Sequence, residues 1–305
     1  MSKSVQLSYV LTVYNKAEAL PLALTFLARD QSDLVCEYIF VDDASTDDSV
    51  ALLKKQTRGW PRVVVVENKK NKGPSLCLNQ GISMAQGEAV FLLDGDDLLR
   101  EGSTAFMYQQ LRHHKADFVY GGWRRVYGVP TMEPLPADPV VHVSTDPLAG
   151  VLEYRCVGMA VMATRALLNR SGGADERLFV QDQSLALRLG FYAHRFLFID
   201  AIVVYAPTTT NALSHNLALQ HHDGFYAFYY ALNEFQKEER HLYAKMVSVL
   251  WKAKRSKVLW WPFFLFYTWV KWFQPKPLAM AWLERCARRL LAPQDRHLSG
   301  RPRSA

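Results

Sequence analysis

The chain has 305 residues, half of them apolar, and a net charge of +7. From Lys252 onward it contains twelve Lys or Arg and two acids, a net of +10, so the residues before Lys252 carry −3. A nucleic-acid-binding protein is therefore disfavoured, because the part expected to fold lacks the basic patch that such proteins use. Four widely spaced cysteines also exclude a disulfide scaffold or a cysteine zinc site.

The first six residues are polar and lead directly into an apolar run. They do not show the basic segment and apolar stretch of an export signal. We therefore expect a cytoplasmic protein with reduced thiols.

Apolar, β-branched runs alternate with helix-like segments through the first third of the chain. The sequence predicts strands at residues 7–13, 36–41, 63–66 and 89–93 and helices at residues 17–28, 45–55 and 75–84. This alternation is typical of an α/β fold in which a mostly parallel central sheet carries helices on both faces.

The remaining residues are expected to complete this domain and to add a C-terminal extension. The periodicity is less regular over residues 101–222, and from residue 223 the pattern turns helical, aromatic and finally basic. We predict one domain over residues 1–222, with halves at 1–100 and 101–222, and a helical extension over residues 223–305.

Small polar and acidic residues follow three of the predicted strands. Thr12, Tyr14 and Asn15 end the first strand, Asp43 ends the second, and the run 94–97 (DGDD) follows the fourth. Ligands of open parallel sheets bind beyond the carboxyl ends of the strands, so we expect these side chains to share one binding edge. A carboxylate such as Asp43 could accept a hydrogen bond from a base N–H there.

The run Asp94-Gly95-Asp96-Asp97 predicts a metal site. In an extended chain Asp94 and Asp96 point to the same side, where their charges repel unless a cation joins them. Oxygen ligands alone favour Mg²⁺ or Mn²⁺, with substrate phosphates completing the coordination. A solvated acidic turn is the alternative. No Gly-rich phosphate loop follows any predicted strand, so a bound nucleotide would need the metal to neutralise its phosphates.

Five ordered segments of the chain resemble glycosyltransferase family 2. They are LTVYNKAEAL, FVDDASTDDS, NKGPSLCLNQGISMAQGEAVFLLDGDD, the turn at residues 171–176 and the segment at residues 180–189. The resemblance covers roughly residues 7–216. It implies a GT-A fold with a nucleotide-sugar half at 1–100 and an acceptor half at 101–222. It also implies inverting transfer of a sugar from a nucleotide-diphosphate donor, with a UDP-sugar favoured.

The resemblance further implies the roles of individual residues. The expected donor-binding residues are Thr12 and Asp43 at the nucleobase, Asp94 at the ribose, and Tyr14, Asn15, Gly73 and His215, with Asp96 on the divalent metal and Asp182 as the catalytic base. Inversion needs a base for the acceptor hydroxyl and an electrophile for the departing diphosphate, and Asp182 and the metal on Asp96 would supply them.

Alternatives and departures accompany these roles. Asp182 could be the N-cap of the helix over residues 183–189, alone or in addition to acting as the base, and His215 could be structural or merely exposed. The family commonly has Glu before the base, where this chain has Gln181, and Arg ahead of the Asn in the third helix, where it has Leu78. The first change removes a negative charge beside Asp182, and the second removes a cation from the donor side.

The aromatic run at residues 258–273 predicts contact with a membrane. It is flanked by lysines and is shorter than the roughly 20 apolar residues of a spanning helix. Such a segment suits an anionic membrane surface; an internal or oligomer contact and a true span are the alternatives. We expect peripheral attachment at the inner face of the cytoplasmic membrane. The acceptor would be a glycan or lipid-linked glycan in cell-envelope polysaccharide or lipopolysaccharide synthesis.

Two other classes of protein share part of this pattern. A sugar nucleotidyltransferase would carry a Gly-rich loop after the first strand, where this chain has Val13, Tyr14 and Asn15. A catalytically silent nucleotide-sugar-binding protein or a membrane scaffold would have no need of Asp182. The sequence therefore favours a transferase.

Overall fold

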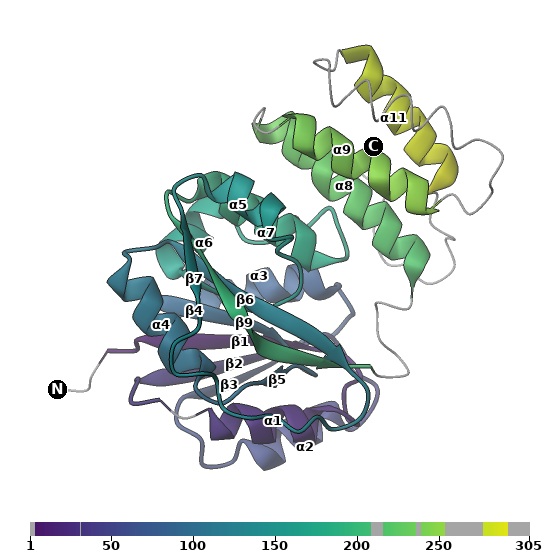
Figure 1. Ribbon diagram of the computed structural model, residues 1–305. Coiled ribbons are helices and arrows are strands. Elements are labelled where there is room, and N and C mark those ends of the chain that lie inside the picture. The colour runs from purple at the N-terminus through teal and green to yellow at the C-terminus, as the bar shows by residue number, and fades with distance from the viewer. Residues whose placement is uncertain (1–3, 31, 209–215, 236–238, 254–276, 292–305) are drawn as a thin grey trace.

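The computed structural model describes residues 4–30, 32–208, 216–235, 239–253 and 277–291. Within these ranges nine strands form one sheet in the order β3-β2-β1-β4-β8-β6-β9-β5, with β7 paired to β9. Helices lie on both faces of the sheet, and the C-terminal helices form a group of their own next to α5 and α7 (Figure 1).

The first four strands are all parallel. β1 (Leu7–Val13) lies between β2 (Cys36–Asp42) and β4 (Ala89–Asp94), and β3 (Val63–Glu67) pairs with the outer side of β2. All seven residues of β1 are buried, as expected for a central strand covered on both faces. The register brings Thr12 opposite Asp94, so the polar ends of β1 and β4 lie next to each other.

Two apolar clusters hold the helices against the two faces of the sheet. Side chains of alternate strand residues enter opposite clusters, with Tyr9 and Leu11 on one face and Val10 on the other. The first face carries α1 (Leu20–Arg29), α2 (Ser49–Gln56) and α4 (Ser103–His113), and the second carries α3 (Pro74–Met84), α5 (Pro147–Glu153), α6 (Arg165–Ser171) and α7 (Gln181–Tyr192).

The strands and helices predicted in the first third are confirmed, but α1 and α2 begin three and four residues later than predicted. The Asp47 carboxylate explains both late starts. It accepts hydrogen bonds from the backbone N–H groups of Ala17 (3.0 Å) and Ser49 (3.0 Å). The segments before the two helices are therefore loops tied to each other.

The second half of the sheet has mixed pairing. β8 (Val161–Thr164) is antiparallel to both β4 and β6 (Phe118–Val126), so β6 runs in the direction of β4. β9 (Phe196–Pro207) is parallel to β6, while β5 (Leu98–Leu99) and β7 (Val141–Ser144) are antiparallel to β9. The parallel arrangement predicted from the alternating segments thus holds in the half that precedes Asp94.

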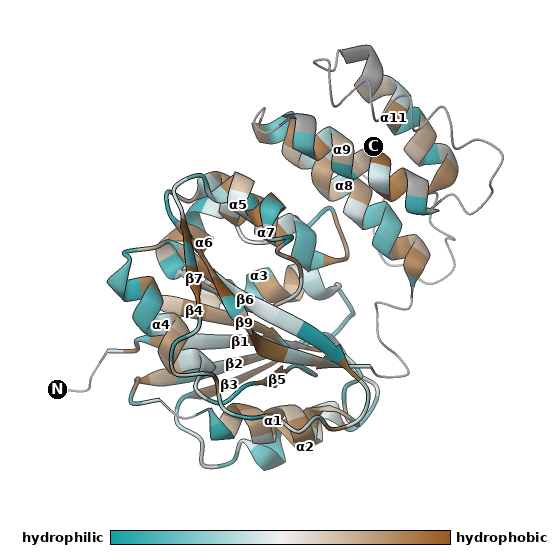
Figure 2. Cartoon of the chain, viewed as in Figure 1, coloured by the Kyte–Doolittle hydropathy of each residue, from teal (hydrophilic) through white to brown (hydrophobic). Residues whose placement is uncertain are grey.

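The C-terminal helices α8 (Leu217–Phe235), α9 (Glu239–Ala253) and α11 (Pro277–Leu290) share an apolar cluster with α5 and α7. Figure 2 shows apolar and hydrophilic stretches on each of them, as expected for helices with one buried face. The predicted division between residues 222 and 223 falls within α8, and the two-part organisation of the chain stays a prediction.

The membrane-contacting run at residues 258–273 lies outside the described residues. Among the helices that are described, none is both long and apolar enough to cross a bilayer.

A buried carboxylate after α1 fixes the start of α4. Asp30 is 4% exposed and accepts hydrogen bonds from the backbone N–H groups of Gly102 (2.6 Å) and Thr104 (3.1 Å). Burial raises the pKa of Asp30 to about 6, although the hydrogen bonds from Thr104 and Gly102 oppose the shift.

Asp30 should make the stability of the fold depend on pH. The unfolded chain loses this proton near the ordinary pKa of about 3.9 and the folded protein near 6, so the free energy of unfolding should fall as pH rises between them. Asp30→Asn lacks this component. The wild type should therefore lose up to about 3 kcal/mol relative to Asp30→Asn between pH 4 and pH 6.5, measured by urea unfolding. Parallel pH profiles for the two proteins would contradict the assignment.

Candidate active site

The tight turn that follows β4 is hydrogen-bonded to the carboxyl end of β1. The Gly95 N–H donates to the Thr12 carbonyl (2.9 Å), and a Cβ on Gly95 would lie only 2.8 Å from that oxygen. Glycine alone permits this approach. The Thr12 hydroxyl in turn donates to Asp94 Oδ1 (3.3 Å). Thr12 and Asp94 therefore meet at the predicted edge.

Three carboxylates of this turn lie close together beside one lysine. Asp97 accepts a hydrogen bond from the Asp94 N–H (3.0 Å), and Asp96 forms an ion pair with Lys16 Nζ. Burial and then the Asp96 charge raise the pKa of Asp94 to about 7, and burial and then the Asp94 charge raise that of Asp97. Burial opposes the charged form of Lys16, but the charge and hydrogen bond of Asp96 raise its pKa overall.

This donor set fits a hard divalent cation. Burial is the largest cause of the raised pKa values of Asp94 and Asp97, and the neighbouring carboxylates raise them further while Lys16 opposes the shift. No group of three His, Cys, Asp or Glu side chains in the described ranges is arranged to hold a metal by itself. Mg²⁺ and Mn²⁺ sites of nucleotide-binding enzymes typically use one or two carboxylates and take the other ligands from phosphates. Asp96 is the carboxylate that would serve, in exchange for its contact with Lys16.

Asp43 lies at the same edge and fixes the loop before α3. Its N–H donates to the Val13 carbonyl (2.8 Å), which places the end of β2 next to the end of β1. Its side chain is 3% exposed and accepts the backbone N–H groups of Lys72 (2.7 Å) and Gly73 (2.8 Å). A carboxylate offers about four lone-pair directions, so these two bonds leave lone pairs that could accept a base N–H. Gly73 has φ 87°, a left-handed conformation that favours glycine.

Tyr14 and Asn15 lie in the loop that follows β1. The Tyr14 side chain is 45% exposed. Asn15 has φ 51°, its Oδ1 accepts the Thr46 N–H (2.8 Å), and its own N–H donates to Ser45 Oγ (2.9 Å). The observed contacts of Asn15 thus connect two loops, whereas Tyr14 faces outward.

Asp182 lies in the first turn of α7. The helix begins at Gln181 with Val180 at the N-cap position, so the alternative that Asp182 is the cap is wrong. Its carboxylate accepts the backbone N–H groups of Gly158 (3.3 Å) and Gln183 (2.9 Å). Burial raises the pKa of Asp182, and these hydrogen bonds oppose the shift.

Gln181 connects the predicted base to the carboxylate turn. It is 5% exposed, and its Nε2 donates to Asp94 Oδ1 (3.1 Å). Asp182 is the next residue, and its charge acts on the Asp94 carboxyl. Thr12, Asp43, Asp94, Asp96 and Asp182 are therefore brought together, whereas His215 lies outside the described residues.

Part of the chain matches a known protein family. Residues 8–157 match the family model described as Glycosyl transferase family 2. The chain contains a glycosyltransferase family 2 domain. All the predicted site residues except Asp182 and His215 lie within the matched range.

Curated relatives match over similar lengths. The glycosyltransferase GlyG of Streptococcus pneumoniae is 31% identical over 117 residues, which are 38% of this chain and 38% of that protein. The poly(ribitol-phosphate) beta-glucosyltransferase of Bacillus spizizenii is 27% identical over 130 residues, 41% of this chain and 20% of its own. The matches thus span well under half the length of these relatives.

Solved structures show that the family 2 domain has the GT-A fold. S. aureus TarS residues 1–349 in complex with UDP-GlcNAc superpose with a TM-score of 0.68 at 17% identity, covering 94% of this chain and 88% of that one. The mannosyltransferase PcManGT of Pyrobaculum calidifontis, in complex with GDP-Man and Mn²⁺, gives a TM-score of 0.61 at 16% identity, covering 96% and 89%.

The structure accounts for the two departures from the usual family 2 sequence. Gln181 donates a hydrogen bond to Asp94, whereas a Glu would put a second carboxylate against it. Leu78 is fully buried on α3 within the apolar cluster between the helix and the sheet. Leu78 therefore contributes packing, and the cation near the carboxylates of this family 2 domain is Lys16.

Sequence reasoning missed three residues of the site. Lys16 carried a signal, since it is a cation four residues after Thr12 in the loop that ends β1. Gly158 and Trp123 carried none, because their contacts cross the fold. The Trp123 indole packs on Gly158, where an added Cβ would lie 3.3 Å from Trp123 Nε1, and the Gly158 N–H reaches Asp182. Gly158 thus contacts both the Trp123 ring and Asp182, the predicted base.

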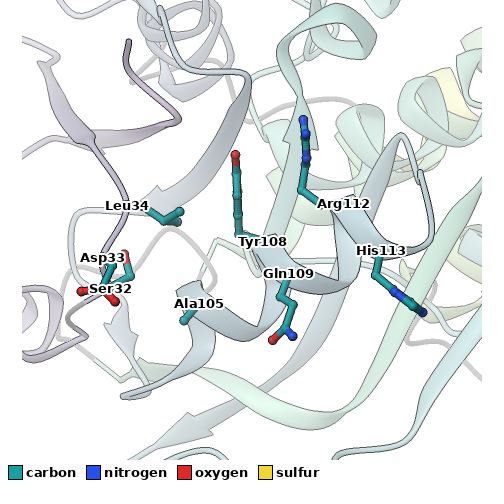
Figure 3. Close-up of a pocket in the computed structure, with 8 residues that line it drawn as sticks. All are labelled: Ser32, Asp33, Leu34, Ala105, Tyr108, Gln109, Arg112 and His113. Atoms are coloured by element: carbon teal, nitrogen blue, oxygen red, sulfur yellow. The ribbon is translucent and has the colours of Figure 1, made fainter. Parts of the chain in front are cut away.

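A hollow of about 650 Å³ elsewhere on the family 2 domain is unrelated to this edge. Figure 3 shows that it lies between the segment before β2, with Leu34, and α4, with Tyr108 and Arg112. Because Leu34 precedes β2, the hollow is at the amino ends of the parallel strands, opposite the carboxylates. Its lining is mostly exposed, and Arg112 is paired with Glu88.

The Gln181 contact predicts the effect of restoring an acid at that position. Gln181→Glu replaces a hydrogen bond by two adjoining carboxylates, so the free energy of unfolding should fall by about 1–3 kcal/mol at pH 8 without divalent metal. The loss should shrink at pH 6, because the pair has a raised pKa in the folded state and protonation relieves the repulsion. Urea unfolding at both pH values measures the effect. Exposed Gln109→Glu is the matched control, and an equal loss in both variants would contradict the contact.

Proposed function

We propose that the protein is an inverting glycosyltransferase that moves a sugar from a nucleotide-diphosphate donor, in the first place a UDP-sugar, to a hydroxyl of a glycan or lipid-linked acceptor. The observation that carries this proposal is the link from Asp94 through Gln181 to Asp182. It joins a half-buried carboxylate suited to proton removal to an acidic turn suited to a metal and a diphosphate. Bound UDP-GlcNAc in TarS supports a UDP-sugar.

The donor would bind along the ends of β1, β2 and β4. Thr12 and Asp43 offer a hydroxyl and a carboxylate to the nucleobase, and Asp94 offers a carboxylate to the ribose. Tyr14, Asn15 and Gly73 belong to the loops around this edge. His215 is proposed as a further phosphate contact.

Asp96 would be the protein ligand of Mg²⁺ or Mn²⁺ at this edge. The ion would neutralise the negative charge that builds up on the departing diphosphate. The Mn²⁺ complex of PcManGT supports this choice of ion. Lys16, which pairs with Asp96, is a second positive charge at this edge.

Asp182 would take the proton of the acceptor hydroxyl. The acceptor oxygen forms a bond to the anomeric carbon as the bond from that carbon to the diphosphate breaks, and the nucleoside diphosphate leaves with the electron pair. A base with a pKa raised by burial accepts a proton more effectively near neutral pH than an ordinary Asp. The Gly158 and Gln183 N–H groups hold its oxygens in place.

Two variants separate the base from the metal ligand. Asp182→Asn should keep donor binding and lose transfer by at least about 100-fold, because the acceptor proton has no base. Asp96→Ala should lose the Mn²⁺-dependent part of donor binding. A thermal-shift panel of UDP-, GDP- and dTDP-sugars with and without Mn²⁺, followed by assays of nucleotide release, measures both.

The outcomes of this panel discriminate between functions. No response of the wild type to any donor would contradict a transferase. Donor binding with full transfer in Asp182→Asn would refute the base assignment. Donor binding by the wild type with no release of nucleotide would indicate a silent nucleotide-sugar-binding protein.

We also propose that the acceptor belongs to the cell envelope and that the basic C-terminal region attaches the enzyme to the inner face of the membrane. Relatives include a poly(ribitol-phosphate) beta-glucosyltransferase and the succinoglycan biosynthesis protein ExoO. The net charge of +10 from Lys252 onward would be attracted by anionic lipids.

Vesicle flotation tests the attachment. The protein should float with phosphatidylglycerol vesicles and not with phosphatidylcholine vesicles, and 0.5 M NaCl should release it. Each charge near an anionic surface contributes about 1 kcal/mol, so removing four should weaken binding at least about tenfold. The variant carries Lys252→Gln, Lys254→Gln, Arg255→Gln and Lys257→Gln. Equal flotation with neutral vesicles would contradict an electrostatic attachment.

A further inference from the structure

Two residues lead into α7, the helix whose first turn carries the predicted base, Asp182. Phe179 and Val180 immediately precede the helix, with Val180 at its N-cap position. The N–H groups at the start of a helix have no intrahelical acceptor and need one from elsewhere. The direction in which Asp182 points depends on what holds these two residues.

The acceptor for both N–H groups comes from α8. Asp223 is 3% exposed, and its Oδ2 accepts the N–H groups of Phe179 (2.7 Å) and Val180 (2.7 Å). Its other oxygen lies 2.7 Å from His222 Nδ1. Hydrogen bonds of backbone N–H groups to a carboxylate are about twice as strong as those between neutral groups.

Two further contacts hold the same segment from other sides. The Ser75 hydroxyl of α3 donates to the Phe179 carbonyl (3.1 Å), and Gln181 donates to Asp94 (3.1 Å). Asp223 is the anchor that comes from beyond the matched range of the family 2 domain. The distance between Asp182 and the donor edge is therefore fixed jointly by α3, β4 and α8.

The packing of α8 against α5 and α7 holds Asp223 in place. Phe225 is fully buried in the cluster that contains Leu187 of α7 and Leu148 of α5. A Cβ on Gly224 would lie 2.8 Å from Gln183 Oε1, so α8 approaches α7 closely at the residue beside Asp223. Farther along the two helices, Glu234 of α8 pairs with Arg188 of α7 (3.2 Å).

We propose that Asp223 is a positioning residue for the transfer reaction, which fixes the segment that carries Asp182 and makes α8 part of the catalytic unit. The inference rests on the proposed function, because it assigns Asp223 to the base of that reaction. It predicts that loss of the two N–H bonds lowers turnover while the donor edge, built from β1, β2 and β4, keeps its affinity. A misplacement of a reacting group by about 1 Å can cost about 100-fold in rate.

The test compares three variants of the full-length protein. Asp223→Ala removes both bonds. Asp223→Asn restores them, because both bonds end on one oxygen and the Asn amide oxygen can take its place. The matched control is Glu234→Ala, which removes a different contact between the same two helices.

The readouts are kcat and donor KM for release of UDP from UDP-N-acetylglucosamine or UDP-glucose with Mn²⁺. Asp223→Ala should lose about 10- to 100-fold in kcat with donor KM within about twofold of the wild type. Asp223→Asn should recover most of kcat. A kcat for Asp223→Ala no lower than for Glu234→Ala, a parallel rise in KM, or an Asn variant no better than Ala would overturn the proposal.

A fourth variant and a measurement of hydrogen exchange complete the test. If Asp223→Ala does not fold, Asp223→Glu keeps the charge and displaces the oxygens by one methylene, and wild-type kcat in that variant would overturn the proposal. Amide hydrogen exchange of residues 179–183 reports the anchor without any assay of activity, and protection should fall about tenfold or more in the Ala variant. If the wild type releases no UDP, the proposed function fails and the catalytic role of Asp223 falls with it. Unchanged exchange in an active enzyme overturns the anchor alone.

Discussion

Excess negative charge at the end of β4 is the constraint to which the rest of this edge responds. Asp94, Asp96 and Asp97 lie within four residues, and the charge of the half-buried Asp182 also acts on Asp94. Carboxylates so close together raise one another's pKa unless a cation or a hydrogen-bond donor compensates. Lys16 supplies the cation and Gln181 supplies the donor. A further cation bound at this site would thus offset more of its negative charge.

Aspartate carboxylates also hold several loops of the fold in place. Asp30, Asp43 and Asp223 each accept two backbone N–H groups from one segment distant in the sequence. Asp47 accepts one from the distant Ala17 and one from the nearby Ser49. Such bonds join a charge to the main chain and do not depend on the side chains of the segment. The ends of the parallel strands determine where the loops begin, and these carboxylates stabilise the path that the loops take.

Much of the fold followed from local pattern. Continuous apolar runs predicted β1 to β4 to within about one residue, because buried parallel strands need such runs and flanking polar residues end them. The antiparallel insertion of β8 between β4 and β6 was not predicted, since pairing direction depends on the path of the chain. The late starts of α1 and α2 depend on Asp47, whose bonds to two loops leave no periodic signal.

The candidate site was likewise predictable only in part. Strand ends identified the acidic turn, but the pairing of Lys16 with Asp96 and the reach of Asp223 to Val180 depend on side chains that meet only after folding. The loop held by Asp43 illustrates what this means for divergence within a family. Asp43 binds the main chain of Lys72 and Gly73, so these two bonds do not depend on the side chain at position 72, which itself donates to Asn68 Oδ1 (3.1 Å). A different side chain at position 72 would therefore change the chemistry beside the donor edge and leave the two main-chain bonds to Asp43 in place.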